Sequence, residues 1–166
     1  MLIDELARNI QNGKQTDLIL LNFSKAFDKV SHNKLLFKLH QFGVRGRNIA
    51  WIKGFLSNSS QRVVVDGEFS TSIPVTSGVP QGSVLGPILF LAYINDLPEQ
   101  LKSQVRLFAD DTVIYNTLDS KGRQSMLQED LKKLEHWETL WDMEFNPSKC
   151  QVIHITTSRT PIRTKY

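Results

Sequence analysis

The chain has 166 residues, of which 40% are hydrophobic and 22% are charged, and it carries a formal net charge of +3. The length and composition exclude a disordered or fibrous protein and indicate one globular domain with its own core. The small positive charge fits a partner with a phosphate backbone but does not require one.

The N-terminus carries Asp4 and Glu5, where a secretory signal peptide would carry positive charge. The most apolar stretch, residues 84–94, contains Gly86 and Pro87 and is shorter than the ~20 residues of a membrane span. We therefore expect an intracellular protein of the cytoplasm or nucleus that has no membrane partner.

The first half of the chain predicts several helices, one buried strand and a hairpin. These elements are an amphipathic helix over 2–12, a strand over 17–23, helices over 31–41 and 47–56, and paired strands over 61–65 and 69–75. The run 18–21 is wholly apolar, which is typical of a strand buried on both faces, although a short helix also fits. Asp66-Gly67 between the paired strands is a strong hairpin signal.

The second half predicts a Gly/Pro-rich loop over 78–82, a helix over 83–95, strands over 104–109 and 112–116, a long helix over 123–144 and a strand over 152–155. Only Asp110-Asp111 separates the first two strands, which predicts a tight turn at these residues. The single cysteine, Cys150, excludes an internal disulfide and indicates a reducing compartment. Residues 156–166 are polar, and we expect a loose tail.

Because the helices do not simply alternate with the strands, we expect an α+β fold in which helices back an antiparallel sheet.

Three segments could carry chemistry. Asp110 and Asp111 repel each other unless a cation is present, and Mg²⁺ prefers carboxylate oxygens, but an acidic turn in solvent fits equally well. The glycine-rich stretch 77–87 exposes backbone amides beside Gln81 at the start of a helix, which suits a nucleotide or base pair, although a plain connector also explains it. Residues 20–28 by themselves indicate only a strand end.

Together, and in this order, the segments resemble motifs A, B and C of the reverse transcriptases of jockey-like non-LTR (LINE-type) retrotransposons. The matching residues are Asn22-Phe23-Ser24-Lys25-Ala26-Phe27-Asp28, Gly78-Val79-Pro80-Gln81-Gly82-Ser83-Val84-Leu85-Gly86-Pro87, Tyr93-Ile94-Asn95-Asp96-Leu97-Pro98, Phe108-Ala109-Asp110-Asp111 and, for motif D, Phe145-Asn146-Pro147-Ser148-Lys149-Cys150. The resemblance runs from about Leu6 to Ile155. It implies a reverse transcriptase-like polymerase palm over residues 1–155, with fingers and thumb largely missing.

The resemblance also implies an RNA-directed DNA polymerase, a nucleotidyltransferase that extends a primer on an RNA or DNA template. Its substrates would be dNTPs and its cofactors two Mg²⁺ ions, with Mn²⁺ as a substitute. Asp110 and Asp111 would be the metal ligands, Asp110 the more directly. Lys149 would approach the triphosphate as a proton donor to pyrophosphate, although a solvated lysine is the alternative.

Four residues would contact the nucleotide by the same resemblance. Phe23 would lie at the nucleotide site, and Phe27 would lie under the incoming sugar and exclude a ribose 2′-hydroxyl, with core packing as the alternative for Phe27. Gln81 and Gly82 would lie along the nascent base pair.

One departure from the family pattern concerns catalysis. The motif A aspartate that ligates both metals is replaced here by Asn22, whose carbonyl oxygen is neutral. We expect metal affinity and rate to fall by several orders of magnitude, and we see no reason for Asp28 to substitute. The chain also starts only 21 residues before Asn22 and ends soon after motif D, which predicts a truncated element copy with little or no activity and no endonuclease domain.

The alternative function is a non-catalytic nucleic-acid-binding remnant of a mobile element, and a third option is a fold remnant without function. Binding would use basic residues, which could equally be solvated helix faces. These residues are Lys34, Lys38, Arg45, Arg47, Lys53 and Arg62.

Overall fold

The computed structural model describes residues 2–57, 59–118 and 121–166. The chain divides into two compact units, one formed by Met1–Ser24 with Asp96–Tyr166 and the other by Lys25–Asn95. We call them the sheet unit and the helical unit and describe each by itself. Within the part of the chain that the structure describes, no helix combines the length and apolar character needed to cross a membrane.

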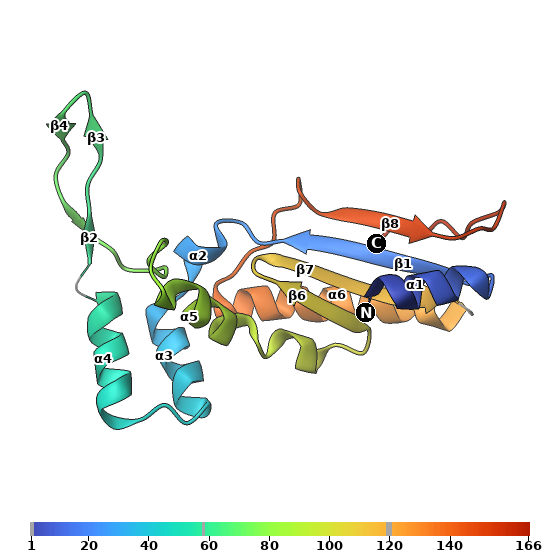
Figure 1. Cartoon of the computed structure of the whole chain (residues 1–166), viewed down its shortest axis with the longest axis horizontal. Coiled ribbons are helices and arrows are strands. Elements are labelled where there is room, and N and C mark those ends of the chain that lie inside the picture. The colour runs from blue at the N-terminus through green and yellow to red at the C-terminus, as the bar shows by residue number, and fades with distance from the viewer. Residues whose placement is uncertain (1, 58, 119–120) are drawn as a thin grey trace. The chain divides into compact units, whose positions relative to one another are not determined.

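The sheet unit contains a four-stranded antiparallel sheet with the strand order β6-β7-β1-β8 (Figure 1). Its strands are β1 (Gln15–Asn22), β6 (Gln104–Phe108), β7 (Asp111–Leu118) and β8 (Gln151–Ile155). The predicted strand over 17–23 is therefore confirmed as the central strand β1. Burial on both faces of the sheet explains why β1 is nearly all buried and why its residues 18–21 form an unbroken apolar run.

Helices cover both faces of this sheet. Asn9 of α1 (Leu2–Gln11) donates to Thr117, while Asn116 of the same strand donates to the sulfur of Met126 in α6 (Lys121–Trp141). Successive residues of a strand point to opposite faces, so α1 and α6 lie on opposite sides of the sheet. The core beneath α6 is built from side chains that are almost completely buried, among them Ile19, Ile114, Leu127, Leu134 and Trp137.

The tail after β8 has no helix or strand, but it is not loose as we expected. The backbone of Ile162 exchanges two hydrogen bonds with the Gln15 side chain, 2.9 and 2.7 Å long, and Tyr166 bonds to Asp17. Both partners are polar residues buried in β1. The tail is attached to the sheet because these buried groups need hydrogen-bond partners.

The helical unit packs three main helices together. These are α3 (His32–Gln41), α4 (Gly46–Ser57) and α5 (Leu85–Ile94), with the short α2 (Ala26–Lys29) before them. Their predicted spans are confirmed to within a few residues. Leu35, Leu56 and Phe90 are almost completely buried, so they form the core of this unit.

A long hairpin follows α4, and its turn at Asp66-Gly67 is confirmed, with φ of 51° and 85° at these residues. The pairing divides into two short ladders, β2 (Ser60–Gln61) with β5 (Ile73–Pro74) and β3 (Val64–Val65) with β4 (Glu68–Phe69). Figure 1 shows β3 and β4 extending away from α4. Between the ladders the hydroxyl of Ser70 accepts the N–H of Val63 at 2.9 Å, in place of a backbone carbonyl. The N–H of Ser70 still donates to the carbonyl of Val63 at 2.9 Å, so only one of the two backbone bonds expected here is replaced. The two longer strands that we predicted are therefore observed as two short ladders.

Candidate active site

The acidic turn lies one residue earlier than the sequence predicted. Phe108 pairs directly with Asp111, so the two turn residues are Ala109 and Asp110, and Asp111 is the first residue of β7. Ala109 has a φ of 51°, in the left-handed region that reverses the chain. The prediction of a turn at Asp110-Asp111 is therefore wrong by one position, and Asp111 is held by a strand rather than by a loop.

Asn22 and Asp111 are cross-strand partners at the ends of β1 and β7. The amide nitrogen of Asn22 lies 2.7 Å from Oδ1 of Asp111 and 3.5 Å from Oδ2 of Asp110. The first distance is a short hydrogen bond to a carboxylate, and the second is at the limit of one. The structure thus brings three of the predicted catalytic residues into one cluster, and the amide group donates to the acidic pair.

The other head atom of Asn22 has a different environment. Its carbonyl oxygen Oδ1 is buried and accepts no hydrogen bond from the described residues. Unpaired buried acceptors are uncommon, because they lose water without a replacement. The attraction between the N–H groups of Asn22 and the two carboxylates therefore determines the orientation of the amide, although its carbonyl oxygen gains no hydrogen bond from the described residues.

The residues after Asn22 hold this strand end in place. The N–H of Asn146 donates to the carbonyl of Asn22 at 2.7 Å, and the ring of Phe23 stacks on Phe145 with centroids 4.4 Å apart. Phe23 is only 2% exposed and also packs against Trp137. Its ring belongs to the core of the sheet unit, and its backbone N–H donates to the carbonyl of Asp110 at 3.3 Å.

Lys149 lines the same surface depression as Asn22 and Asp111, a cavity of about 400 Å³ in the sheet unit. It follows a turn in which the Asn146 side chain accepts hydrogen bonds from the N–H and hydroxyl of Ser148, at 3.1 and 2.7 Å. Lys149 is exposed. The structure therefore places an exposed, positively charged side chain in the same depression as Asn22 and Asp111.

The donor set fits a divalent cation in part. Asp110 and Asp111 offer hard oxygen ligands, and they lie next to each other. Asn22 as oriented presents N–H groups, which cannot bind a cation. Over residues 2–57, 59–118 and 121–166, no group of three or more His, Cys, Asp or Glu side chains could hold a metal. Asp110 and Asp111 fit the implied metal, and Asn22 fits it only after its amide rotates.

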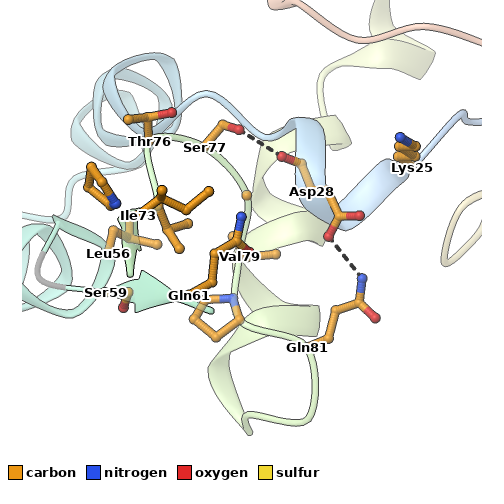
Figure 2. A pocket seen from close by; sticks show the side chains of 14 residues that line it. Lys25, Asp28, Leu56, Ser59, Gln61, Ile73, Thr76, Ser77, Val79 and Gln81 are labelled. Atoms are coloured by element: carbon orange, nitrogen blue, oxygen red, sulfur yellow. Dashed lines mark hydrogen bonds between the residues drawn. The ribbon is translucent and has the colours of Figure 1, made fainter. Parts of the chain in front are cut away.

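The remaining predicted residues belong to the helical unit. Gln81 donates a hydrogen bond of 3.0 Å to the Asp28 carboxylate, and the Ser77 hydroxyl donates one of 2.9 Å to the Asp28 carbonyl. Figure 2 shows the side chains of Gln81 and Asp28 pointing toward each other at the edge of a pocket. This pocket has a volume of about 640 Å³ and is also lined by Lys25. The pairing of Gln81 with Asp28 was not predicted, since their separation in sequence gave no signal.

Phe27 and Gly82 occupy contrasting environments in the same unit. The half-buried ring of Phe27 stacks on Phe90 with centroids 4.8 Å apart, so the packing alternative for Phe27 holds for at least one face of the ring. Gly82 is exposed with a φ of 81°, and an added Cβ would meet nothing within 4 Å. Its conformation requires glycine, whereas the space around it does not.

The prediction that Lys38 belongs to an exposed basic surface is wrong. Lys38 is only 4% exposed, and its ammonium group donates to the carbonyl of Tyr93 and lies 5.0 Å from the centre of that ring. It is neither a solvated lysine nor available for a phosphate. Arg62 lies over the ring of Phe69 at 4.2 Å, while Arg47 and Lys53 remain exposed.

Comparison with known proteins relates nearly all of the chain to one protein family. The family model described as "Reverse transcriptase (RNA-dependent DNA polymerase)" matches residues 2–164. The chain is 33% identical over 139 residues to the RNA-directed DNA polymerase from mobile element jockey of Drosophila melanogaster, covering 78% of this chain and 15% of that protein. It is 27% identical over 164 residues to the probable RNA-directed DNA polymerase from transposon X-element of the same species, covering 95% and 18%. The chain thus spans less than a fifth of either relative.

Solved structures show the same fold at low sequence identity. Apo telomerase from Candida tropicalis superposes with a TM-score of 0.67 and 12% identity, covering 95% of this chain and 31% of that one. The telomerase of that species in complex with a fragment of telomeric RNA gives a TM-score of 0.65, also at 12% identity, covering 92% and 28%. These matches are consistent with the predicted α+β palm fold.

Proposed function

Because this chain belongs to the reverse transcriptase (RNA-dependent DNA polymerase) family, we propose that it forms the palm of an enzyme that extends a primer on an RNA or DNA template with dNTPs. It is a reverse transcriptase domain of the kind found in non-LTR retrotransposons. The family consists of nucleotidyltransferases that depend on divalent cations. We place this activity in the cytoplasm or nucleus, where RNA and DNA templates are found.

The observation that carries the proposal is the cluster of Asn22, Asp110 and Asp111 at neighbouring strand ends. Adjacent strands hold Asn22 and Asp111 opposite each other, and the turn before β7 brings Asp110 within 3.5 Å of the same Asn22 amide. Asn22 and Asp111 line a depression that Lys149 also lines. Residues held by a sheet keep their geometry better than residues on a loop. The cluster is therefore suited to positioning a reactive group.

Within this proposal, Asp110 and Asp111 would hold Mg²⁺, or Mn²⁺ as a substitute. When bound, two such ions would activate the primer hydroxyl and offset the charge of the triphosphate. Lys149 is exposed and would donate a proton to the departing pyrophosphate. By resemblance to the family, Phe23 and Phe27 would lie at the site of the incoming nucleotide, and Gln81 and Gly82 along the nascent base pair.

We further propose that Asn22 makes the activity weak or absent. The aspartate found at this position in the family would add a negative charge, and Asn22 supplies none. Its amide instead donates to Asp111 at 2.7 Å. Two cations close together repel each other strongly unless carboxylates compensate their charge. The cluster therefore retains the shape of a metal site with a reduced affinity for metal.

Primer extension on a primed RNA template, with Mg²⁺ and separately with Mn²⁺, tests this function. We expect Asn22→Asp to extend the primer at least roughly 100-fold faster than wild type, which corresponds to about 2.7 kcal/mol in the barrier. Adding Asp110→Asn to that variant should abolish the gain. Equal rates for wild type and Asn22→Asp would contradict the proposed weakening.

The second candidate function is nucleic-acid binding without catalysis, and the amide of Asn22 facing Asp111 is the observation that favours it. A primer–template would then bind with an affinity that falls steeply with salt, because phosphate contacts release counterions. Binding of this kind by wild type, together with no extension by either wild type or Asn22→Asp, would support this function over the first.

A further inference from the structure

The two carboxylates of the cluster are connected by a neutral group of the chain itself. Asn22 stands opposite Asp111 in the register of β1 and β7, and its amide nitrogen lies between that carboxylate and the one of Asp110, at 2.7 and 3.5 Å. Neighbouring carboxylates repel each other and normally require a cation or several donors. Here the side-chain N–H groups of Asn22 place partial positive charge between the carboxylates of Asp110 and Asp111.

The orientation of this amide follows from electrostatics. With the opposite orientation, the carbonyl oxygen of Asn22 would lie against Oδ1 of Asp111, and two oxygen atoms without a proton between them repel. The present orientation leaves that carbonyl oxygen buried and without a donor among the described residues. The attraction to the carboxylates therefore outweighs the loss of solvation at Oδ1.

We propose that Asn22 is a positioning residue that takes the place of a cation and holds Asp110 and Asp111 together when no metal is bound. A cation must break the hydrogen bond between Asn22 and Asp111 before all three side chains can turn oxygens toward it. The strand ends of this chain therefore need no divalent cation for stability. This inference rests on the proposed function only for the identity of the cation.

An exchange of two residues tests the inference on the free chain. Thermal unfolding is measured with EDTA and with excess Mg²⁺ for wild type, Asn22→Asp, Asp111→Asn and the double variant Asn22→Asp/Asp111→Asn. The double variant keeps the net charge and one amide–carboxylate pair across the same strands, with the roles reversed. Asn22→Asp alone places three carboxylates at one strand end and removes the donor.

In EDTA we expect Asn22→Asp to unfold a few degrees below wild type. The double variant should unfold closer to wild type than Asn22→Asp does. Mg²⁺ should restore most of the loss in Asn22→Asp, because binding to the folded state stabilises it, and should change wild type and the double variant little. The proposal is overturned if wild type gains as much from Mg²⁺ as Asn22→Asp, or if the double variant is no more stable than Asn22→Asp.

Asn12→Asp is the matched control. Asn12 is exposed, immediately follows α1 and precedes β1, so the substitution adds the same charge at the end of the strand remote from Asn22. Its unfolding should not depend on Mg²⁺. Since no primer is present, the unfolding temperatures are independent of polymerase activity. If they change as expected but the chain never extends a primer, only the proposed function is contradicted. If the chain extends primers but the unfolding temperatures do not change as expected, only the role of Asn22 is contradicted.

Discussion

The hydroxyl of Tyr166 donates a hydrogen bond of 2.7 Å to Oδ2 of Asp17, a carboxylate that is completely buried in β1. Burial raises the pKa of Tyr166, and the hydrogen bond to Asp17 and the negative charge of that residue raise it further above its ordinary value of 10.0. The folded chain therefore holds this proton more tightly than the unfolded chain does. The contact stabilises the folded state at neutral pH and loses its effect as the pH rises above about 10.

The first prediction follows from this linkage. Tyr166→Phe should lower the free energy of unfolding by about 1 kcal/mol at neutral pH, the usual value of one hydrogen bond. The difference from wild type should shrink as the pH rises above about 10, because only wild type carries the titrating hydroxyl. Urea unfolding of both proteins across this range measures the difference. If the difference in free energy of unfolding stays constant with pH, ionisation of the Tyr166 hydroxyl is not linked to folding.

A second prediction concerns Asp130, which is fully buried in α6 and accepts the N–H groups of Lys102 and Ser103 at 3.0 and 2.7 Å. Burial alone would raise the pKa of Asp130, but hydrogen bonds from Lys133 and Ser103 outweigh it and hold the pKa below its usual range. Asp130→Asn should cost about 1–3 kcal/mol at neutral pH. The cost should diminish as the pH falls below about 4 through the lowered pKa, because wild type is then protonated as well.

Glu129→Gln provides the control for Asp130. Glu129 lies 3.5 Å from Lys102, and both side chains are more than half exposed. Exposed ion pairs contribute little, so this variant should stay within about 0.5 kcal/mol of wild type. Similar losses from the two substitutions would mean that charge, rather than the buried hydrogen bonds, stabilises the segment before β6.

A third prediction compares two glycines that share a conformation. Gly78 and Gly67 have φ of 89° and 85°, but a Cβ at Gly78 would lie 2.9 Å from the backbone of Asp28, whereas one at Gly67 would meet nothing within 4 Å. Gly67→Ala should therefore cost about 1–2 kcal/mol from backbone strain alone. Gly78→Ala should cost about 1–3 kcal/mol more, because the loop must move off α2. Chemical denaturation of both variants checks this, and equal losses would contradict the close approach.

A fourth prediction separates the two phenylalanines of motif A. Phe23→Ala should cost about 3–5 kcal/mol, because a stacked ring that is 2% exposed leaves a cavity in the core. Phe27→Ala should cost less, since that ring is only half-buried. In an Asn22→Asp background, Phe27→Ala should instead increase incorporation of ribonucleotides relative to deoxyribonucleotides. Unchanged sugar selectivity would leave Phe27 with a packing role alone.

Much of this architecture could be predicted from the sequence, because apolar spacing reports which side of an element is buried. The run 18–21 identified the central strand β1, and the leucines of the long helix identified α6. The register of the strands could not be predicted in the same way. Two apolar strands flank Asp110-Asp111, and only the pairing of Phe108 with Asp111 decides that the turn is formed by Ala109 and Asp110.

The residues of the candidate site were predicted from the sequence, but the contacts between them were not. The resemblance identified Asn22, Asp110 and Asp111, yet only the cross-strand geometry shows that the nitrogen of Asn22 faces the carboxylates. The docking of the tail was missed for a similar reason. Its partners Gln15 and Asp17 are 147 and 149 positions away from Ile162 and Tyr166, and hydrogen bonds over such separations leave no local pattern.

The division of the hairpin after α4 into two short ladders affects how readily the chain could associate with itself. Val63, Val64 and Val65 are all more than half exposed, and a continuous β-edge with such a sequence would recruit a strand from another molecule. The pairing is divided into two short ladders. Between them Ser70 accepts the N–H of Val63 with its side-chain hydroxyl, while its own N–H donates to the Val63 carbonyl. Each ladder offers an edge of only two residues, too short to template further strands. The division into two short ladders thus limits the length of β-edge that this apolar hairpin offers to another molecule.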